Sequence, residues 1–359
     1  MRIAFYAPLK PPDHPTPSGD RKVARLLIAA LRLAGHEVTL ASRLRSYDGS
    51  GDVLAQIEIA ARGKRTAASL VRRWRENPAA PELWFTYHLY YKAPDHLGPA
   101  VCDALGIRYV VAEASFAAKR ANGAWATNHA AVERALRRAD RVIGLNSADR
   151  DGVLPLLASP RRWTALPPFL DTALYRPSPR DPDRAPRLVT VAMMRPGDKL
   201  DSYRQLGAAL TRLRNLAWTL DIIGDGPARE DVAAAKAPLG ERISWLGALS
   251  DEAVAECLGA ADLYVWPAVN EAYGMALLEA QASGLPVVAG RSGGVADIVE
   301  HGVTGLLVPP GDIAAFAEAV RLLIDQPRRR AAMGEAALRK VRRDHDLAAA
   351  AAQLGAALA

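Results

Sequence analysis

The sequence alternates short runs rich in β-branched and aromatic residues with longer stretches rich in Ala, Leu and Arg. This alternation is typical of parallel strands joined by crossover helices, because each apolar strand needs a helix to cover its face. The expected strands of the first half are Arg2–Ala7, Glu37–Ala41, Leu83–Tyr87, Tyr109–Ala112 and Arg141–Leu145. Those of the second half are Leu188–Met193, Trp218–Ile223, Ile243–Leu246, Leu263–Trp266, Pro286–Ala289 and Gly305–Val308. The sequence therefore predicts an α/β fold with two Rossmann-like domains in tandem.

The length of 359 residues exceeds what one ordinary core organises and favours two domains. Repeated prolines between Pro167 and Pro186 block continuous helix or sheet, and an interdomain linker is expected there. We predict an N-terminal domain over residues 1–168 and a C-terminal domain over 169–345. Residues 346–359, which are almost entirely Ala and Leu, are expected to form a helix that packs back on the body.

The composition limits the class of protein. Half of the residues are hydrophobic and 24% are charged, which is ordinary for a folded protein and excludes a disordered or fibrous chain. The two cysteines, Cys102 and Cys257, lie far apart without CxxC spacing, so neither a disulfide framework nor a zinc site is indicated. The N-terminus lacks the pattern of a signal peptide, and no apolar run is long enough to span a bilayer. A cytoplasmic location is expected.

The net charge of +7 is concentrated in the first half of the chain. Residues 1–175 hold 25 Lys and Arg against 16 Asp and Glu, whereas residues 176–359 hold 21 against 23. Clusters such as Arg72-Arg73-Arg75 could attract an anionic membrane at its inner face or a phosphorylated acceptor, and a solvated basic surface is the alternative. Nucleic acid is not expected, because aromatic residues do not alternate with these charges as stacking platforms would.

One segment, residues 270–288, carries the strongest chemical signal. A strand ends at Pro267, a loop brings Glu271, and a helix is expected to begin near Gly274. Unpaired amides at a helix start can hold a phosphate or a sugar oxygen. Glu279 lies eight positions after Glu271, so both carboxylates can accept hydrogen bonds from the hydroxyl groups of one ligand, although a solvated helix face would show the same spacing.

This segment resembles the signature of family 4 retaining glycosyltransferases, a group 1 type: Glu, seven residues, Glu, then a small-residue helix end with Gly-Leu-Pro-Val-Val. The resemblance continues in order along residues 187–325. It includes Ile222-Ile223-Gly224-Asp225-Gly226-Pro227, Ala261-Asp262-Leu263-Tyr264-Val265-Trp266-Pro267, Gly293-Gly294-Val295-Ala296-Asp297-Ile298-Val299 and Gly302-Val303-Thr304-Gly305-Leu306-Leu307-Val308. A nicotinamide enzyme is disfavoured, because the third glycine of a dinucleotide fingerprint is replaced by Arg229.

The resemblance implies a GT-B fold, in which two Rossmann-like domains face each other across a cleft. The first domain would take the acceptor, and the second would take a nucleotide sugar, expected to be a UDP-sugar or a GDP-sugar. Transfer would proceed with retention and without a metal or other cofactor, and the acceptor, a glycan, a lipid or a small molecule, stays unidentified. The alternatives are a noncatalytic protein of the same fold that binds nucleotide sugars, and a nucleotide-sugar epimerase, for which no acid and base pair is evident.

The resemblance also assigns roles to residues of the second domain. Arg195 and Lys199 would neutralise the diphosphate, Glu271 would contact the donor sugar, and Glu279 would contact the ribose. Three backbone positions would hold the sugar and phosphate, and two glycines would form the turn of the nucleotide site. These are Tyr273, Gly274, Met275, Gly224 and Gly226.

In the first domain, Pro17-Ser18-Gly19-Asp20 resembles the glycine loop that approaches the donor phosphates, with Gly19 allowing close approach; a capped turn is the alternative. The family tends to place a histidine after a first-domain strand, near the anomeric carbon. The matching stretch, Tyr109 to Ser115, has none. His88, at the end of the preceding strand, or Glu113 is expected to replace it. Lys119 and Arg120 are further candidates for acceptor or phosphate contacts.

Overall fold

The computed structural model describes residues 1–16, 18–179, 184–271 and 273–359. Pro17 of the predicted glycine loop, Pro182 of the predicted linker and Ala272 of the predicted signature lie outside these ranges. The chain forms two compact units. Unit 1 comprises Met1–Pro167 with Leu347–Ala359, and unit 2 comprises Pro168–Asp346.

Unit 1 is built on a parallel sheet with the strand order β2-β1-β3-β4-β5-β6. The strands are β1 (Arg2–Tyr6), β2 (Glu37–Ser42), β3 (Leu83–Leu89), β4 (Arg108–Ala114), β5 (Arg141–Gly144) and β6 (Trp163–Ala165). The helices are α1 (Gly19–Leu33), α2 (Val53–Arg75), α3 (Gly98–Leu105), α4 (Ala126–Arg138), α5 (Arg150–Val153) and α13 (Leu347–Leu358). The five strands predicted for this half are present, and β6, with three residues, was not predicted.

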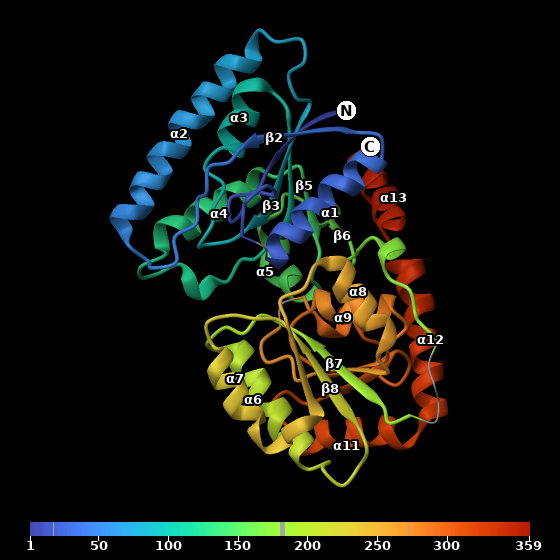
Figure 1. Cartoon of the computed structure of the whole chain (residues 1–359). Helices are drawn as coiled ribbons and strands as arrows, with labels where there is room; N and C mark the ends of the chain where they lie inside the picture. The colour runs from blue at the N-terminus through green and yellow to red at the C-terminus, as the bar shows by residue number, and fades with distance from the viewer. Residues whose placement is uncertain (17, 180–183, 272) are drawn as a thin grey trace. The chain divides into compact units, whose positions relative to one another are not determined.

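Helix α1 shows how the sequence pattern becomes packing. Ser18 accepts a hydrogen bond from the Arg21 amide and caps the helix, and Leu27 and Leu31 are completely buried on its inner face. Burying a leucine side chain stabilises a fold by about 2 kcal/mol. The C-terminal helix α13 lies beside α1 (Figure 1), and the Arg108 guanidinium donates a hydrogen bond of 2.6 Å to the Leu358 carbonyl. The last residues of the chain are therefore part of unit 1.

Unit 2 contains a second parallel sheet, with the order β12-β11-β10-β7-β8-β9. The strands are β7 (Arg187–Val191), β8 (Thr219–Ile223), β9 (Ile243–Gly247), β10 (Leu263–Trp266), β11 (Val287–Gly290) and β12 (Gly305–Val308). The helices are α6 (Asp198–Thr211), α7 (Arg229–Lys236), α8 (Asp251–Ala260), α9 (Met275–Ala282), α10 (Val295–Ile298), α11 (Ile313–Asp325) and α12 (Pro327–Asp344). Two parallel sheets with crossover helices confirm the predicted α/β class and its two Rossmann-like units.

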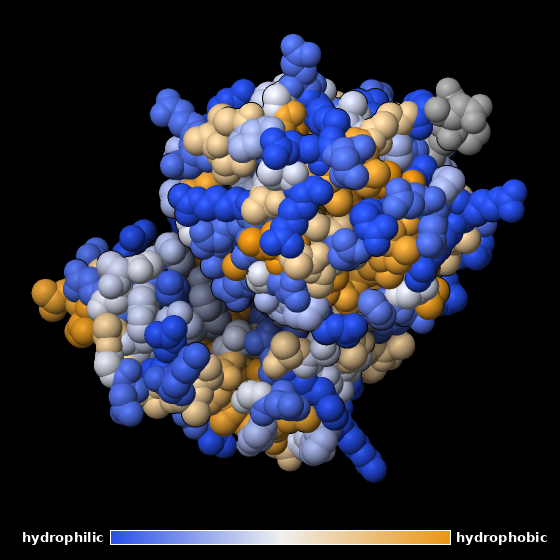
Figure 2. All heavy atoms as spheres, turned by 90° about the horizontal axis from the view of Figure 1, so that it is seen from below, coloured by the Kyte–Doolittle hydropathy of each residue, from blue (hydrophilic) through white to orange (hydrophobic). Residues whose placement is uncertain are grey.

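The surface is mixed in character. Figure 2 shows hydrophobic side chains interspersed among hydrophilic ones on the face that it presents. Within the described ranges, no helix combines the length and the hydrophobicity that crossing a bilayer requires.

Candidate functional site

The strand order of each sheet reverses next to its first strand. In unit 1 the chain passes from β1 to β2 on one side of β1 and then to β3 on the other side. In unit 2 the strands β7, β8 and β9 follow one another in one direction, and β10 then pairs with the opposite edge of β7. Ligands of open α/β sheets bind at the carboxyl ends of the strands beside such a reversal. The segments that follow β1, β3, β7 and β10 carry most of the predicted site residues, so the topology itself places them at two candidate sites.

In unit 2, Lys199 and Glu271 meet at this position although 72 residues separate them. The Lys199 ammonium donates to Glu271 Oε2 at 2.5 Å, and the indole Nε1 of Trp266 donates to the same oxygen at 3.2 Å. The Lys199 ammonium also lies over the Trp266 ring, 5.4 Å from its centroid. Only 16% of the Glu271 side chain is exposed, against 30% of Lys199. The pair is partly shielded from water, which strengthens its charge interaction.

Lys199 lies in the first turn of α6. A cation at a helix N-terminus opposes the helix dipole, so Lys199 is not there to stabilise the helix. Arg195 remains in the loop between β7 and α6 and is exposed, and within the described residues its guanidinium forms no hydrogen bond, ion pair or ring contact. The two predicted cations therefore differ: Lys199 is held in place by Glu271, and Arg195 is not.

The loop that carries Glu271 is strained and firmly anchored. Ala268 and Asn270 both adopt left-handed backbone conformations, with φ of 56° and 50°. Such residues cost about 1–3 kcal/mol each and persist where their surroundings enforce them. The Asn270 amide donates to Asp198 at 2.8 Å, and the Glu271 backbone amide donates to the Ser292 hydroxyl at 3.1 Å. These contacts fix the position of the Glu271 carboxylate. Strain of this kind often accompanies a functional site.

Helix α9 begins where the signature predicted. Gly274 precedes it with φ of 76°, a backbone conformation that favours glycine, and a Cβ at this position would lie 2.6 Å from a Leu277 methyl group, which would have to shift. Among the described residues, no side chain caps this helix start. Amides of its first turn, including that of Met275, can therefore donate to a ligand. Tyr273 immediately precedes this turn, and Glu279 lies within the helix with only 6% of its surface exposed.

Gly224 and Gly226 follow β8 and press against the loop after β7. Their φ angles are 139° and 153°, and a Cβ would lie 1.9 Å from the Ala192 carbonyl oxygen or 2.3 Å from that of Met194. The backbones are also hydrogen bonded, since the Met194 amide donates to the Asp225 carbonyl at 2.9 Å. The two glycines thus hold together the loops after β7 and β8 that lie next to Arg195.

Replacing Gly224 by alanine is expected to lower the free energy of unfolding by about 2 kcal/mol or more, because the backbone contact cannot accommodate a methyl group. Gly19→Ala is the matched control: Gly19 is exposed, and no atom lies within 4 Å of the position of its Cβ. Urea denaturation of the two variants tests this. Equal stability of Gly224→Ala and wild type would show that these loops relax at little cost.

In unit 1, His88 and Glu113 occupy neighbouring positions on β3 and β4. The sequence suggested that the strands end before them, but both lie inside their strands, because pairing continues on either side through Tyr87 with Ala112 and Leu89 with Ala114. His88 and Glu113 have left-handed φ angles of 63° and 56°. Two adjacent strained residues at the carboxyl edge of the sheet are unusual, and they bring both candidate replacements for the missing histidine to one place.

Asp20, in the first turn of α1, completes this group. The His88 Nδ1 atom donates to Asp20 Oδ1 at 2.8 Å, and 20% of the His88 side chain is exposed. Burial lowers the pKa of the imidazole, but the charge of Glu113, the hydrogen bond and charge of Asp20 and the charge of Asp149 outweigh it and raise the pKa from 6.5 to about 9. The imidazole is therefore a cation at neutral pH. The sequence predicted Asp20 only as part of the glycine loop or of a capped turn, and the cap is provided by Ser18.

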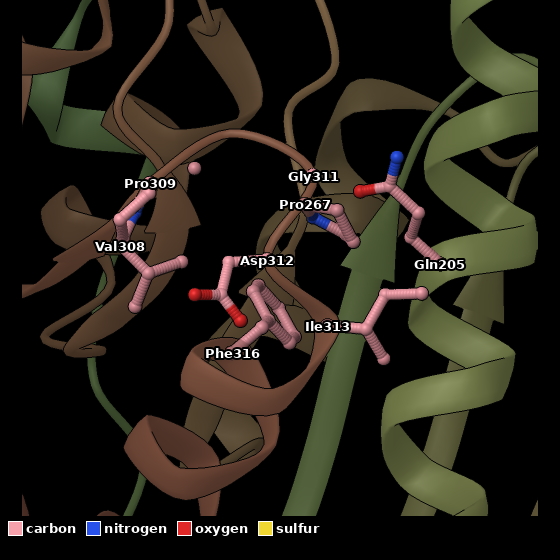
Figure 3. A pocket seen from close by; sticks show the side chains of 9 residues that line it. Gln205, Pro267, Val308, Pro309, Gly311, Asp312, Ile313 and Phe316 are labelled. Atoms are coloured by element: carbon pink, nitrogen blue, oxygen red, sulfur yellow. The ribbon is translucent and has the colours of Figure 1, made fainter.

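Two surface pockets lie away from these groups. Figure 3 shows one in unit 2, lined by Gln205 of α6, Pro267 after β10 and residues around the start of α11; its volume of about 10 Å3 suits about one water molecule. The other, of about 310 Å3, lies in unit 1 at the amino ends of β3 and β4, between Trp74 and Ile107. That is the edge of the sheet opposite to His88. Neither pocket contains a predicted site residue.

Comparison with known proteins agrees with the motifs of unit 2. Residues 175–340 match the model of the family described as glycosyl transferases group 1. A D-inositol 3-phosphate glycosyltransferase of Nocardia farcinica is 30% identical over 217 residues, which are 55% of this chain and 48% of that protein. The chain spans about half the length of this relative. The matches support the group 1 part of the predicted resemblance over the residues that they cover, whereas membership of family 4 and retention stay predictions.

Solved structures resemble the whole chain. A sucrose-phosphate synthase from Thermosynechococcus elongatus has a TM-score of 0.73 at 20% identity and covers 99% of this chain and 98% of its own. The Anabaena protein HepE in complex with UDP has a TM-score of 0.76 at 19% identity, over 100% of this chain and 99% of its own. These likenesses confirm the predicted GT-B fold.

Proposed function

We propose that the chain is a retaining glycosyltransferase, which binds a nucleotide sugar on unit 2 and an acceptor on unit 1. The observation that carries this proposal is the Lys199–Glu271 pair at the strand-order reversal of the unit that matches group 1 glycosyl transferases. The pair joins a cation suited to a diphosphate with a carboxylate suited to sugar hydroxyls. The UDP-bound HepE structure supports a nucleotide sugar as the donor, and a UDP-sugar or a GDP-sugar is proposed.

The proposed transfer breaks the bond between the anomeric carbon and the diphosphate oxygen and forms one between that carbon and an acceptor oxygen. The acceptor proton passes to the departing diphosphate, so no separate base is required. The Lys199 ammonium has three protons and can keep its bond to Glu271 while donating to the leaving group. Arg195 and amides of the first turn of α9 add further positive charge there. With these groups the reaction is proposed to need no metal.

Donor binding is the first test of the proposal. UDP-, GDP- and ADP-sugars are added to the protein, and the one that binds is expected to raise the melting temperature, because a ligand of the folded state stabilises it. Glu279→Gln is expected to weaken this binding about tenfold, through loss of a charged acceptor for the ribose hydroxyls. Glu252→Gln, on the exposed side of α8, is the matched control. No shift with any of the nucleotide sugars would contradict the proposal.

The noncatalytic alternative makes a different prediction in the same assay. A protein that only binds nucleotide sugars would show the shift without hydrolysis or transfer. Release of the free nucleoside diphosphate from the donor, measured with and without an acceptor mixture, separates the two.

His88 is proposed to act as a cation near the anomeric carbon, in place of the histidine that the family has elsewhere. Wild-type kcat/KM is then expected to fall above a pH of about 9, where the imidazolium loses its proton. Asp20→Asn removes a hydrogen-bonded carboxylate that raises this pKa. The fall in kcat/KM should therefore begin at lower pH in this variant, and its activity near pH 8 should be roughly tenfold lower than that of wild type. A pH–rate profile identical to wild type would rule out this role, and Asp151→Asn serves as an exposed control.

A further inference from the structure

A row of aromatic rings extends from His88 across unit 1. The His88 and Tyr90 ring centroids are 4.8 Å apart, Tyr90 and Tyr91 are 5.6 Å apart, and Tyr91 and Trp125 are 5.2 Å apart. Tyr90, Tyr91 and Trp125 are half-buried, so part of each ring reaches the surface. The row begins at the carboxyl edge of the sheet, where the ligands of α/β proteins bind. We call these four side chains the aromatic row.

Two cations lie over the far end of this row. The Arg120 guanidinium is 4.8 Å from the Tyr91 ring centroid, and the Lys92 ammonium is 5.9 Å from that ring and 5.6 Å from the ring of Trp125. In the part of the chain that the structure describes, neither cation forms an ion pair with a carboxylate. A neutral ring holds a cation in position without cancelling its charge. Two fixed and uncompensated positive charges therefore stand beside the aromatic surface.

This arrangement differs from an ordinary basic surface. Some exposed arginines on helices of this chain pair with acidic neighbours, as Arg137 does with Glu133 and Arg321 does with Glu318. Lys92 and Arg120 come from separate segments, the turn that follows β3 and the short 3-10 turn Ala118–Arg120, and converge on one ring. Convergence of cations without acidic partners is the arrangement that an anionic ligand requires.

We propose that the aromatic row with Lys92 and Arg120 is the acceptor site, and that the acceptor is a ring-shaped polyol carrying a phosphate. The inference rests on the proposed function and names its acceptor class. The two cations would hold the phosphate, and the apolar face of the ring would pack on Tyr90 and Tyr91 with its reacting hydroxyl directed toward His88. The phosphate itself takes no part in bond formation.

The phosphate could belong to a soluble sugar phosphate or to a lipid headgroup. The start of α2 bears on this question, because it exposes Leu54 and Ile57, with 76% and 54% of their surfaces in water. The side-chain amide of Gln56, on the same turn, donates to the Ala124 carbonyl at 2.9 Å. This hydrogen bond links the helix that carries the two apolar side chains to the residue before Trp125. An acyl chain leaving the row would find an apolar surface there. The experiment therefore has one arm for each source.

The experiment measures binding to the full-length protein by calorimetry. The soluble arm compares glucose 6-phosphate with glucose, and the membrane arm compares phosphatidylcholine vesicles with and without phosphatidylinositol. Wild type is expected to bind one phosphorylated probe and to bind its neutral counterpart at least about tenfold more weakly. The double variant Lys92→Gln/Arg120→Gln should weaken that binding roughly tenfold to a hundredfold, as loss of two charge-assisted contacts requires.

The control variant removes two exposed cations elsewhere, Arg328→Gln/Arg329→Gln on α12 of unit 2, and should bind like wild type. Donor binding, measured in the same samples, should be unchanged in both variants and shows that they are folded. Binding of both neutral and phosphorylated probes alike, binding unaffected by the Lys92 and Arg120 changes, or no binding in either arm would overturn the proposal. Failure of donor binding in wild type would instead count against the proposed function.

Discussion

Replacing Lys199 by methionine is expected to reduce kcat by roughly a hundredfold to a thousandfold, which is the usual effect of removing one donor that stabilises charge in a transition state. The charge on the diphosphate oxygen grows as its bond to the anomeric carbon breaks. Lys199 is fixed for this purpose, because Glu271 at 2.5 Å and the Trp266 ring hold its ammonium before any ligand arrives. The KM for the donor should change less, since the contact strengthens during the reaction.

Two further variants separate this role from a loss of folding. Arg204→Met removes a cation from the exposed side of the same helix, where Arg204 pairs with Asp201, and should leave kcat unchanged. Lys199→Arg keeps the charge but alters its geometry and should recover part of the activity. Thermal unfolding of all three variants shows whether the fold persists. If a folded Lys199→Met protein keeps its wild-type kcat, the ammonium does not assist departure of the diphosphate.

Much of the fold followed from local pattern. The predicted strands are apolar runs whose ends are set by Pro, Gly and charged residues, and such punctuation survives tertiary packing. Strand β6 was missed because its three residues, Trp163 to Ala165, carry no periodicity of their own and pair only because β5 offers a free edge. Likewise, the residues around His88 and Glu113 give little sign of a left-handed backbone, since histidine favours it only weakly and glutamate does not favour it.

The candidate site was predicted in its parts but not in its contacts. The resemblance identified Glu271 and Lys199 separately, whereas their pairing depends on β7 and β10 being neighbours in the sheet. Trp266 was quoted only as part of a strand, and its hydrogen bond to Glu271 emerges from the loop conformation. The glycines after β8 were predicted as ligand contacts. The structure gives a second reason for glycine at these positions, because the two loops pack too closely there to leave room for a Cβ. A single sequence does not show which side chains that lie far apart along the chain will come into contact.

A chain of contacts links this site to a buried lysine. Trp266 packs against the Tyr203 ring with the centroids 5.0 Å apart, and Lys236 of α7 lies over the same ring, 5.6 Å from its centroid, while donating to the Tyr203 carbonyl. Only 2% of Lys236 is exposed. Burial alone lowers the pKa of its amine from 10.5 to about 7. Helix α6, which carries Lys199, therefore packs on an amine whose protonation lowers the free energy of unfolding.

Lys236→Met is expected to stabilise the protein most at low pH. Between a pH of about 7 and 10.5 the unfolded chain keeps this proton and the folded chain does not, so the wild-type free energy of unfolding rises with pH by an amount that the methionine variant lacks. From about pH 6 to pH 9.5 this difference amounts to about 3 kcal/mol. Methionine fills the volume of the lysine stem, and the Tyr203 carbonyl lies inside α6, where it keeps its helical acceptor role.

Urea denaturation at several pH values measures the pH dependence of the free energy of unfolding for Lys236→Met and wild type, with Lys64→Met, at an exposed lysine of α2, as the control. Parallel slopes for Lys236→Met and wild type would mean that the amine keeps its proton in the folded state, and that charge, rather than neutrality, is what the contact with α6 requires.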